Sequence, residues 1–303
     1  MNAENLRQGE PADAAEKDIK ALDALFQEVG TYKKSSELME LLNFIKKFPK
    51  IAPFNAHLLH IQKPGSRFVT YAPTWKNEYG RTIKPGARPL IILVPFGPVG
   101  YVFELEDTEG EPFPEELLKP FKTEGTIPNT LFNTLIRNLP RKGILYIEAD
   151  YGTTRAGMIE IADQKGRQFL YSYKFKNKQH DVFAQILYNL CVNKNLSKED
   201  IFATIVHELA HLHCGHLGAP YPKWWPDRRY IKHNASEFEA ECVTWLICER
   251  LGLKNPSVQY LANFLDNNKT IPDISLDRVL KAAGDIENMT TKTITAEKEI
   301  IVK

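Results

Sequence analysis

The four-residue spacing of His207 and His211 constrains the fold more than any other feature of this sequence. Side chains four residues apart lie one above the other on a helix, so both imidazoles can reach one metal ion only if this segment is helical. An apolar run precedes the pair, and Ser197 begins a sequence that resembles a capping box, which together predict a helix over residues 198–216. Glu208 follows the first histidine and could take a proton from a water at such a site. The alternative is a pair of core histidines satisfied by hydrogen bonds.

A hydrolytic zinc site needs a third protein ligand and an open fourth position. His213 lies about 200° around the helix from the second motif histidine and cannot share its face. His216 follows Gly215, where we expect the helix to end. The metzincin spacing also fails, because Cys214 and Leu217 stand where that pattern requires Gly and His. We therefore expect both extra histidines to face solvent or to lie behind the ligands.

The acidic segment 237–241 offers a better third ligand. Glu237 and Glu241 stack on one face of a helix predicted over residues 235–252, whereas Glu239 points elsewhere. We interpret Glu237 as the third zinc ligand. Glu241 would accept the remaining N–H of a ligating histidine and hold its tautomer. The alternative is that these acids form a solvated face near a helix N-terminus.

The rest of the chain predicts an α+β fold in two parts. Residues 31–110 mix helices and strands, and residues 126–288 form a mainly helical domain with a small sheet. We expect a polar tail and a helix in residues 1–30 and a flexible tail in residues 289–303. Further predicted helices cover residues 38–45, 53–62, 128–138, 180–192, 256–267 and 275–284, and predicted strands cover residues 67–71, 90–95, 101–105, 143–148, 157–161 and 168–173.

The net charge of +1 conceals two oppositely charged parts. Residues 31–104 hold eleven Lys and Arg against four Glu, together with eleven aromatic residues, while the remainder of the chain carries −6. A basic and aromatic surface suits a groove that follows phosphates and stacks bases. Equally, such aromatic side chains can fill a core while the basic ones face water. The candidate nucleic-acid-binding residues are Arg67, Tyr71, Trp75, Lys76, Arg81 and Lys84.

Composition excludes several classes of protein. With 43% apolar and 25% charged residues, the chain is typical of a globular protein. The longest apolar run, residues 89–96, is too short to span a bilayer, and the first residues lack the order of a signal peptide. The four cysteines form no C-x-x-C pair, so no disulfide framework or thiolate zinc knuckle is indicated. We expect a protein of the reducing cytoplasm without a membrane partner, and the oligomeric state stays open.

The segment Thr204–Gly218, TIVHELAHLHCGHLG, with Glu237 and Ala240 three residues apart downstream, resembles the ImmA/IrrE family of zinc metallopeptidases. The resemblance implies a gluzincin-like zincin fold for residues 126–288. The later glutamate of the family falls on Glu237. Many family members carry Asn or Asp where Glu241 stands, a difference that concerns the residue behind the histidines and not the ligands.

Short motifs are scattered through the N-terminal part: Asn55-Ala56-His57-Leu58-Leu59, Gln62, Trp75, Gly80-Arg81, Lys84-x-Gly86, Val102-Phe103 and Asp107-Thr108. They resemble the single-stranded-DNA-binding domain of ArdC-type antirestriction proteins, in which this domain precedes a peptidase domain of the same kind. The resemblance implies that residues 31–110 bind single-stranded DNA. The two resemblances together extend from Leu38 to Phe264.

Together these features predict a metalloendopeptidase with one Zn²⁺ ion. Glu208 would deprotonate the attacking water and pass the proton to the leaving amine. Tyr260 is a candidate donor to the developing oxyanion, with His213 and His233 as alternatives. The family resemblance implies a cytoplasmic, DNA-associated regulatory protein as the substrate. The alternative function is a non-catalytic DNA-binding antirestriction or DNA-protecting protein in which zinc stabilises the fold.

Overall fold

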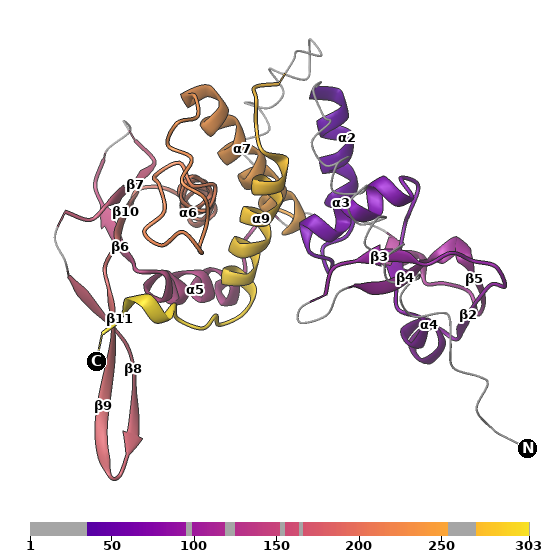
Figure 1. Ribbon diagram of the computed structural model, residues 1–303, viewed down its shortest axis with the longest axis horizontal. Coiled ribbons are helices and arrows are strands. Elements are labelled where there is room, and N and C mark those ends of the chain that lie inside the picture. Colours follow the sequence, from indigo (N-terminus) through magenta and orange to yellow (C-terminus); the bar gives the residue numbers. More distant parts are fainter. Residues whose placement is uncertain are drawn as a thin grey trace, which may run out of the picture.

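The computed structural model describes residues 35–94, 99–118, 125–151, 155–163, 166–253 and 271–302. Within these ranges the chain is mixed α+β, with seven α-helices and several small sheets (Figure 1). The tail and helix expected in residues 1–30, the helix expected in residues 256–267 and Tyr260 lie outside the described residues. Every helix in the described part of the chain is too short or too polar to cross a membrane.

The N-terminal elements are a helix pair followed by two small sheets, with strand orders β1-β4-β3 and β2-β5. They comprise α2 (Ser35–Ile45), α3 (Pro53–Gln62), β1 (Val69–Thr70), α4 (Ala72–Tyr79), β2 (Arg81–Ile83), β3 (Leu90–Ile92), β4 (Gly100–Glu104), β5 (Thr108–Gly110) and the 3₁₀ turns η1 (Leu105–Asp107) and η2 (Glu115–Leu118). Helix α3 has its predicted bounds, since Pro53 suits a first helical turn. Helix α4 was not expected from the sequence. It ends at Gly80, whose φ of 62° is a left-handed cap.

The remaining described elements build a three-stranded sheet with helices against it and a long hairpin. They comprise α5 (Asn129–Asn138), β6 (Ile144–Ala149), β7 (Gly157–Ile161), β8 (Arg167–Phe175), β9 (Lys178–Gln185), β10 (Tyr188–Asn193), α6 (Lys198–His213), α7 (His233–Arg250), α9 (Leu276–Thr291), β11 (Ile301–Val302) and the 3₁₀ turns η3 (Leu139–Lys142) and η4 (Lys298–Ile300). Strand β10 runs parallel to β6 and antiparallel to β7. Helix α6 packs between this sheet and the helices α7 and α9 (Figure 1).

Strand β7 lies close against α6 because it begins with glycine. A Cβ on Gly157 would lie 2.5 Å from Thr204 Cγ2 and 2.9 Å from the carbonyl oxygen of Cys191, so a larger residue would push the strand away. Thr204 is one helical turn before His207, and this approach therefore sets β7 beside the histidine pair. Among the described strands β7 pairs only with β10, which leaves its other edge open.

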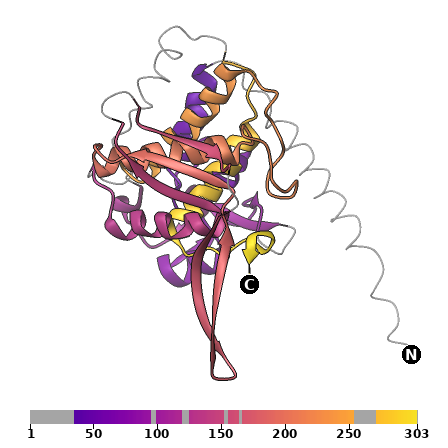
Figure 2. The same cartoon turned by 90° about the vertical axis from the view of Figure 1, so that its left-hand side faces the viewer.

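The helix predicted over residues 180–192 is wrong, because this segment forms parts of strands β9 and β10. Val182 and Ala184 are buried while their neighbours are not, which is the two-residue period of a strand. Lys176 and Asn177 join β8 to β9 with φ angles of 47° and 61°, both positive as a type I′ hairpin turn requires. Figure 2 shows this hairpin projecting from the body of the protein.

The flexible tail predicted for residues 289–303 is also wrong for its described part. Helix α9 continues to Thr291, and β11 pairs antiparallel with β9. The side-chain amide of Asn138 donates to the carbonyl oxygens of Met289 and Lys292 at 2.7 and 2.8 Å. The polar composition of this segment did not predict order, because its partners lie more than 100 residues away in the sequence.

The guanidinium of Arg250, at the end of α7, joins the two halves of the chain. Arg250 is only 5% exposed. It donates to the carbonyl oxygens of Ile45, Phe48 and Ile51, at 3.0, 3.0 and 2.9 Å, where the chain leaves α2. It also forms an ion pair with Glu287 of α9. A buried contact therefore crosses the predicted boundary between the N-terminal part and the rest.

Candidate metal centre

Helices α6 and α7 bring the three predicted ligands together. The Nε2 atoms of His207 and His211 lie 3.2 Å apart. Glu237 places Oε2 at 3.6 Å from His207 Nε2 and Oε1 at 3.4 Å from His211 Nε2. The four-residue spacing on α6 aligns the two imidazoles, and the second turn of α7 supplies the carboxylate between them.

These separations suit a zinc ion. Tetrahedral bonds of about 2.0–2.1 Å place neighbouring ligand atoms about 3.3–3.4 Å apart. The observed separations of 3.2, 3.4 and 3.6 Å bracket that value. The three side chains are 14–30% exposed, so an ion and a substrate can reach them. Two imidazoles and one carboxylate are also a donor set of hydrolytic zinc sites, and the residues present therefore fit the ion.

The electrostatics of the centre favour a cation. The imidazoles of His207 and His211 beside it hold the pKa of the Glu237 carboxyl far below its usual range, so this side chain is ionised. Burial lowers the pKa of His207, but its contact with Glu237 and the charges of Glu241 and Glu208 outweigh burial and raise that pKa above its ordinary value. The same negative charges that attract a proton here would attract a metal ion.

Glu241 lies behind His207, on the side of the ring away from Glu237. Its Oε1 is 3.6 Å from Nδ1 of His207. A histidine that binds metal through Nε2 carries its proton on Nδ1, and a carboxylate at this position faces that proton. The separation is longer than a hydrogen bond, so the structure brings Glu241 near its predicted partner without forming the bond.

Glu208 is held at the open edge of the sheet. Its Oε2 accepts a hydrogen bond from the backbone N–H of Ile159 in β7 at 3.0 Å. Ala156 and Ala162 flank the strand. The carbonyl oxygen of Ala156 accepts from Asn193, and the N–H of Ala162 donates to Leu187, so the backbone of both residues bonds toward β10. Because backbone groups alternate along a strand, Ile159 faces the open edge. The carboxylate of Glu208 therefore lies between helix α6 and a free strand edge.

The end of α6 turns the chain back toward His211. The N–H of Gly215 donates to the carbonyl oxygen of Leu212, and the N–H of His216 donates to that of His211, both at 3.0 Å. This pair of bonds defines a Schellman motif. Gly215 has a φ of 84°, and a Cβ there would lie 2.0 Å from the carbonyl oxygen of Pro226, so the turn requires glycine. The motif places the ring of His216 beside that of His211.

His216 lies behind His211, one of the two places expected for it, and forms with Glu239 a hydrogen-bonded chain whose link to Glu239 the sequence did not reveal. His216 Nδ1 lies 2.9 Å from His211 Nδ1, and His216 Nε2 lies 2.9 Å from Glu239 Oε2. Metal binding through Nε2 leaves the His211 proton on Nδ1, where it is donated to His216. His216 then carries its own proton on Nε2 and donates it to Glu239. One tautomer of each ring thus satisfies the whole chain.

Cys214, His216 and Glu239 form a second group of possible ligands, with atoms within 4.8 Å of one another. Glu239 already accepts two bonds from Arg228, at 2.7 and 2.6 Å, and one from the N–H of Ser275 at 2.6 Å. Burial raises the pKa of the Cys214 thiol well above its ordinary value, so the thiol stays protonated. A neutral thiol and a carboxylate paired with Arg228 attract a cation weakly. This group supports the histidine pair instead.

Replacing His216 by Ala is expected to weaken zinc binding by about 10–100-fold, because His211 loses the acceptor for its Nδ1 proton. Competition with a chromophoric zinc chelator measures this affinity. His180→Ala removes an exposed histidine on β9 and is the matched control, which should bind zinc as the parent does. An unchanged affinity in His216→Ala would contradict the role assigned to His216.

The candidate oxyanion donors lie in different surroundings. His213 is fully buried, with Nδ1 3.5 Å from Asp285 of α9. The expectation that it faces solvent or supports the ligands is therefore wrong, because the face of α6 opposite the centre packs against α9. His233 is exposed, and its Nδ1 lies 3.5 Å from Glu237 Oε1, at the rim of the centre.

Two of the six candidate nucleic-acid-binding residues serve the N-terminal fold itself. Trp75 is fully buried and donates its Nε1–H to the carbonyl oxygen of Phe103 at 2.9 Å. The prediction that its ring stacks on bases is wrong, because other rings enclose it. These rings are Phe68, Tyr79 and Phe113. Arg81 donates to the side-chain and backbone oxygens of Thr108, at 2.8 and 2.9 Å, and so ties β2 to β5.

Acidic residues of η1 pair with basic side chains in the part of the fold that carries the other four candidates. These four exposed residues are Arg67, Tyr71, Lys76 and Lys84. Arg67 pairs with Glu106 at 3.3 Å, and Lys63 pairs with Asp107 at 2.8 Å. Residues 31–118 as a whole hold eleven Lys and Arg against ten Asp and Glu. The positive excess of residues 31–104 is therefore offset by the segment that packs beside them.

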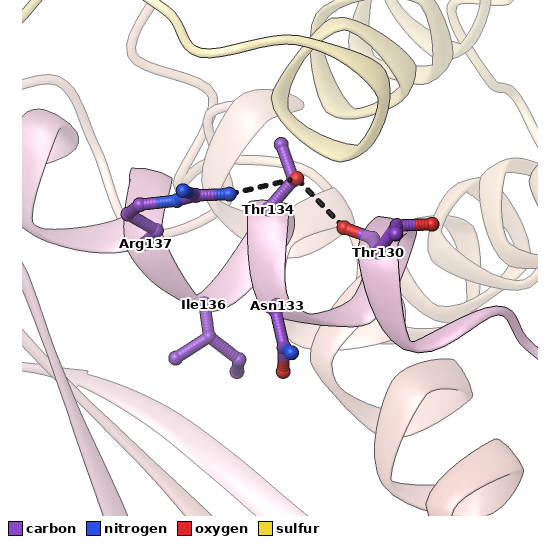
Figure 3. Close-up of a pocket in the computed structure, with 5 residues that line it drawn as sticks. All are labelled: Thr130, Asn133, Thr134, Ile136 and Arg137. Carbon is purple, nitrogen blue, oxygen red and sulfur yellow. Dashed lines mark hydrogen bonds between the residues drawn. The ribbon is translucent and has the colours of Figure 1, made fainter.

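A hollow of about 620 Å³ lies over helix α5, away from the histidine pair (Figure 3). Its lining residues are Thr130, Asn133, Thr134, Ile136 and Arg137. Arg137 donates to Thr134 Oγ1 at 3.1 Å, and Thr134 donates to the carbonyl oxygen of Thr130 at 2.7 Å. The lining carries no acid, base or nucleophile beside this engaged arginine, and we assign it no chemistry.

Comparison with known proteins adds little to this geometry. No family model matches the sequence, and no curated protein matches it. Among solved structures, the metal-free crystal structure of the antirestriction protein ArdC from plasmid R388 is similar, at 15% identity and a TM-score of 0.35, over 78% of this chain and 84% of that chain. A likeness of this degree carries no argument for the fold or the activity of this chain.

Proposed function

We propose that the protein is a zinc-dependent metallopeptidase. One observation carries the proposal: His207, His211 and Glu237 direct three ligand atoms at one point, with separations that suit a zinc ion, and Glu208 lies next to them in the sequence on the same helix. A zinc ion held there would supply Lewis acidity and a nucleophile at neutral pH.

The chain's own residues would divide the remaining work. Glu208 would act as general base toward the attacking water and then return the proton to the leaving amine. His216 and Glu239 would hold His211 in the tautomer that leaves Nε2 free to bind. His233, at the rim, is the described residue best placed to donate to a developing oxyanion, whereas His213 is buried away from the centre.

The open edge of β7 would bind the substrate. Backbone groups of Gly157, Ile159 and Ile161 face away from β10 and, apart from the Ile159 N–H that bonds to Glu208, could pair with an extended peptide as a further strand. The bond between Ile159 and Glu208 places this edge next to the general base. A peptide paired with β7 would thus present its backbone to the centre.

The resemblance to the ImmA/IrrE family further suggests a cytoplasmic, DNA-associated regulatory protein as the substrate, and this part of the proposal rests on the resemblance alone. Binding of single-stranded DNA by residues 31–110 receives less support, because Trp75 is buried and the charges of residues 31–118 nearly balance. The second candidate function, a non-catalytic DNA-binding protein with a structural zinc, predicts metal binding without cleavage.

Metal content and peptide cleavage by the purified protein test the proposal. We expect about one zinc per chain by plasma mass spectrometry, lost in His211→Ala and kept in His180→Ala. Digestion of a peptide library made from a bacterial proteome should yield new termini, which vanish with 1,10-phenanthroline and return when zinc is restored. Bound zinc without new termini would favour the structural role, and absence of zinc would overturn both functions.

A further inference from the structure

The β8–β9 hairpin exposes more aromatic surface than its fold requires. Every residue from 171 to 181 is exposed, and the ribbon stands clear of the body (Figure 2). A two-stranded ribbon gains little stability by itself, and cross-strand contacts between its rings add only a modest amount. The exposed rings of β8 are Phe169, Tyr171, Tyr173 and Phe175, at 55, 42, 46 and 58% exposure. An exposed aromatic surface of this kind is typical of an interaction site.

The strand register collects three of these rings on one face, whereas Phe169 opposes Phe183 across a register shift and lies outside this row. Tyr171, Tyr173 and Phe175 are two residues apart and oppose Val182, His180 and Lys178 of β9. The rise of a strand spaces alternate side chains by about 6.4–6.8 Å. The rings of Tyr173 and His180 stack with centroids 5.2 Å apart and an interplanar angle of 18°. The face is a row of flat rings at regular intervals.

The hairpin is also positively charged. Residues 167–185 hold four basic residues against one acid, Asp181, which is engaged by Ser172 at 2.6 Å. The basic residues are Arg167, Lys174, Lys176 and Lys178. Among the described residues, no ion pair involves the three lysines. Pairing two such hairpins would bring like charges together, which argues against a second copy as the partner.

We propose that this face of the β8–β9 hairpin binds single-stranded nucleic acid. Rings at regular intervals offer stacking platforms for unpaired bases. Lys178, which opposes Phe175 on this face, and Lys176, in the turn, match the phosphates. Lys174, in contrast, alternates to the opposite face. A duplex keeps its bases stacked on one another and would leave the rings unused. An acidic polypeptide would match the lysines but offers no flat rings in succession. The site is separate from residues 31–110 and does not depend on the proposed peptidase activity.

Fluorescence anisotropy of labelled dT20 between 50 and 200 mM NaCl tests the proposal. Removing the two lysines beside the rings, in Lys176→Gln/Lys178→Gln, should lower the slope of log affinity against log salt by about 1.4, since each phosphate contact contributes about 0.7 for a single strand. Removing the rings, in Tyr171→Ser/Tyr173→Ser/Phe175→Ser, should weaken binding at least about ten-fold.

The matched control, Lys292→Gln/Lys298→Gln, removes two exposed lysines outside the hairpin and should change affinity less than about two-fold. All variants should keep the zinc content and melting temperature of the parent, because the replaced side chains are exposed. Failure of the parent to bind dT20, or a control variant that loses as much affinity as the hairpin variants, would overturn the proposal. The proposal would also fail if poly-glutamate competed for the protein as well as dT20 does and the ring variant bound dT20 as the parent does. That result would point to an acidic polypeptide as the partner.

Discussion

Glu208→Gln is expected to lower kcat/KM for a cleaved peptide by about 10²–10⁴-fold while the protein keeps its zinc. Glutamine has the shape of glutamate and can still accept the hydrogen bond from Ile159, but it cannot take a proton from the attacking water. Turnover of a fluorogenic peptide chosen from the library products measures the loss, and plasma mass spectrometry measures the metal.

Glu160→Gln is the matched control, because Glu160 is an exposed carboxylate on the same strand as Ile159. It should retain the activity of the parent. Turnover by Glu208→Gln at the parental rate would exclude Glu208 as the general base. If the parent itself binds zinc but cleaves nothing, the ion belongs to the fold, and the DNA-binding alternative gains the support that the peptidase loses.

Arg250→Ala is expected to lower the free energy of unfolding by about 3–5 kcal/mol. The change leaves Glu287 without its cation and leaves several buried carbonyl oxygens between Ile45 and Ile51 without their donor. Urea unfolding followed by circular dichroism measures the loss. The expected loss of stability is large because removing one partner leaves the other charge buried and unpaired. This costs more free energy than the intact pair contributes.

Lys46→Ala is the control for this prediction. Lys46 crosses the same interface to Glu249 at 3.1 Å, but both side chains are about a quarter exposed, so we expect a loss below about 1 kcal/mol. Arg250→Lys should fall between the two, because lysine keeps the charge but cannot reproduce the fork of donors. Equal losses in Arg250→Ala and Lys46→Ala would show that Arg250 does not join the halves.

Local periodicity predicts what lies on one helix or one strand. The bounds of α3 and β7 follow from the predicted ranges 53–62 and 157–161. The four-residue spacing on α6, and the choice of Glu237 over Glu239, likewise anticipate which side chains the structure brings together. These inferences need only the local repeat of a helix or of a strand, which the sequence displays directly.

Contacts between distant segments escape that reasoning. Glu239 seemed unimportant because it points away from Glu237, yet its partners Arg228 and Ser275 lie 11 and 36 residues away and no local pattern connects them. The net charge of residues 31–104 leaves out Glu106, which lies just beyond that range in the sequence but forms an ion pair with Arg67 in the fold. The misassigned helix over 180–192 joined the end of β9 to β10, and the two-residue period within each piece is too brief to stand out.

The contacts of Arg250 join residues separated by 199 to 205 positions in the chain. A contact of such long range closes a large loop, so we expect it to form late in folding. Interactions absent from the folding transition state slow unfolding rather than speed folding. We therefore expect Arg250 to act mainly on the lifetime of the native state, and Arg250→Ala to raise the unfolding rate more than it lowers the folding rate.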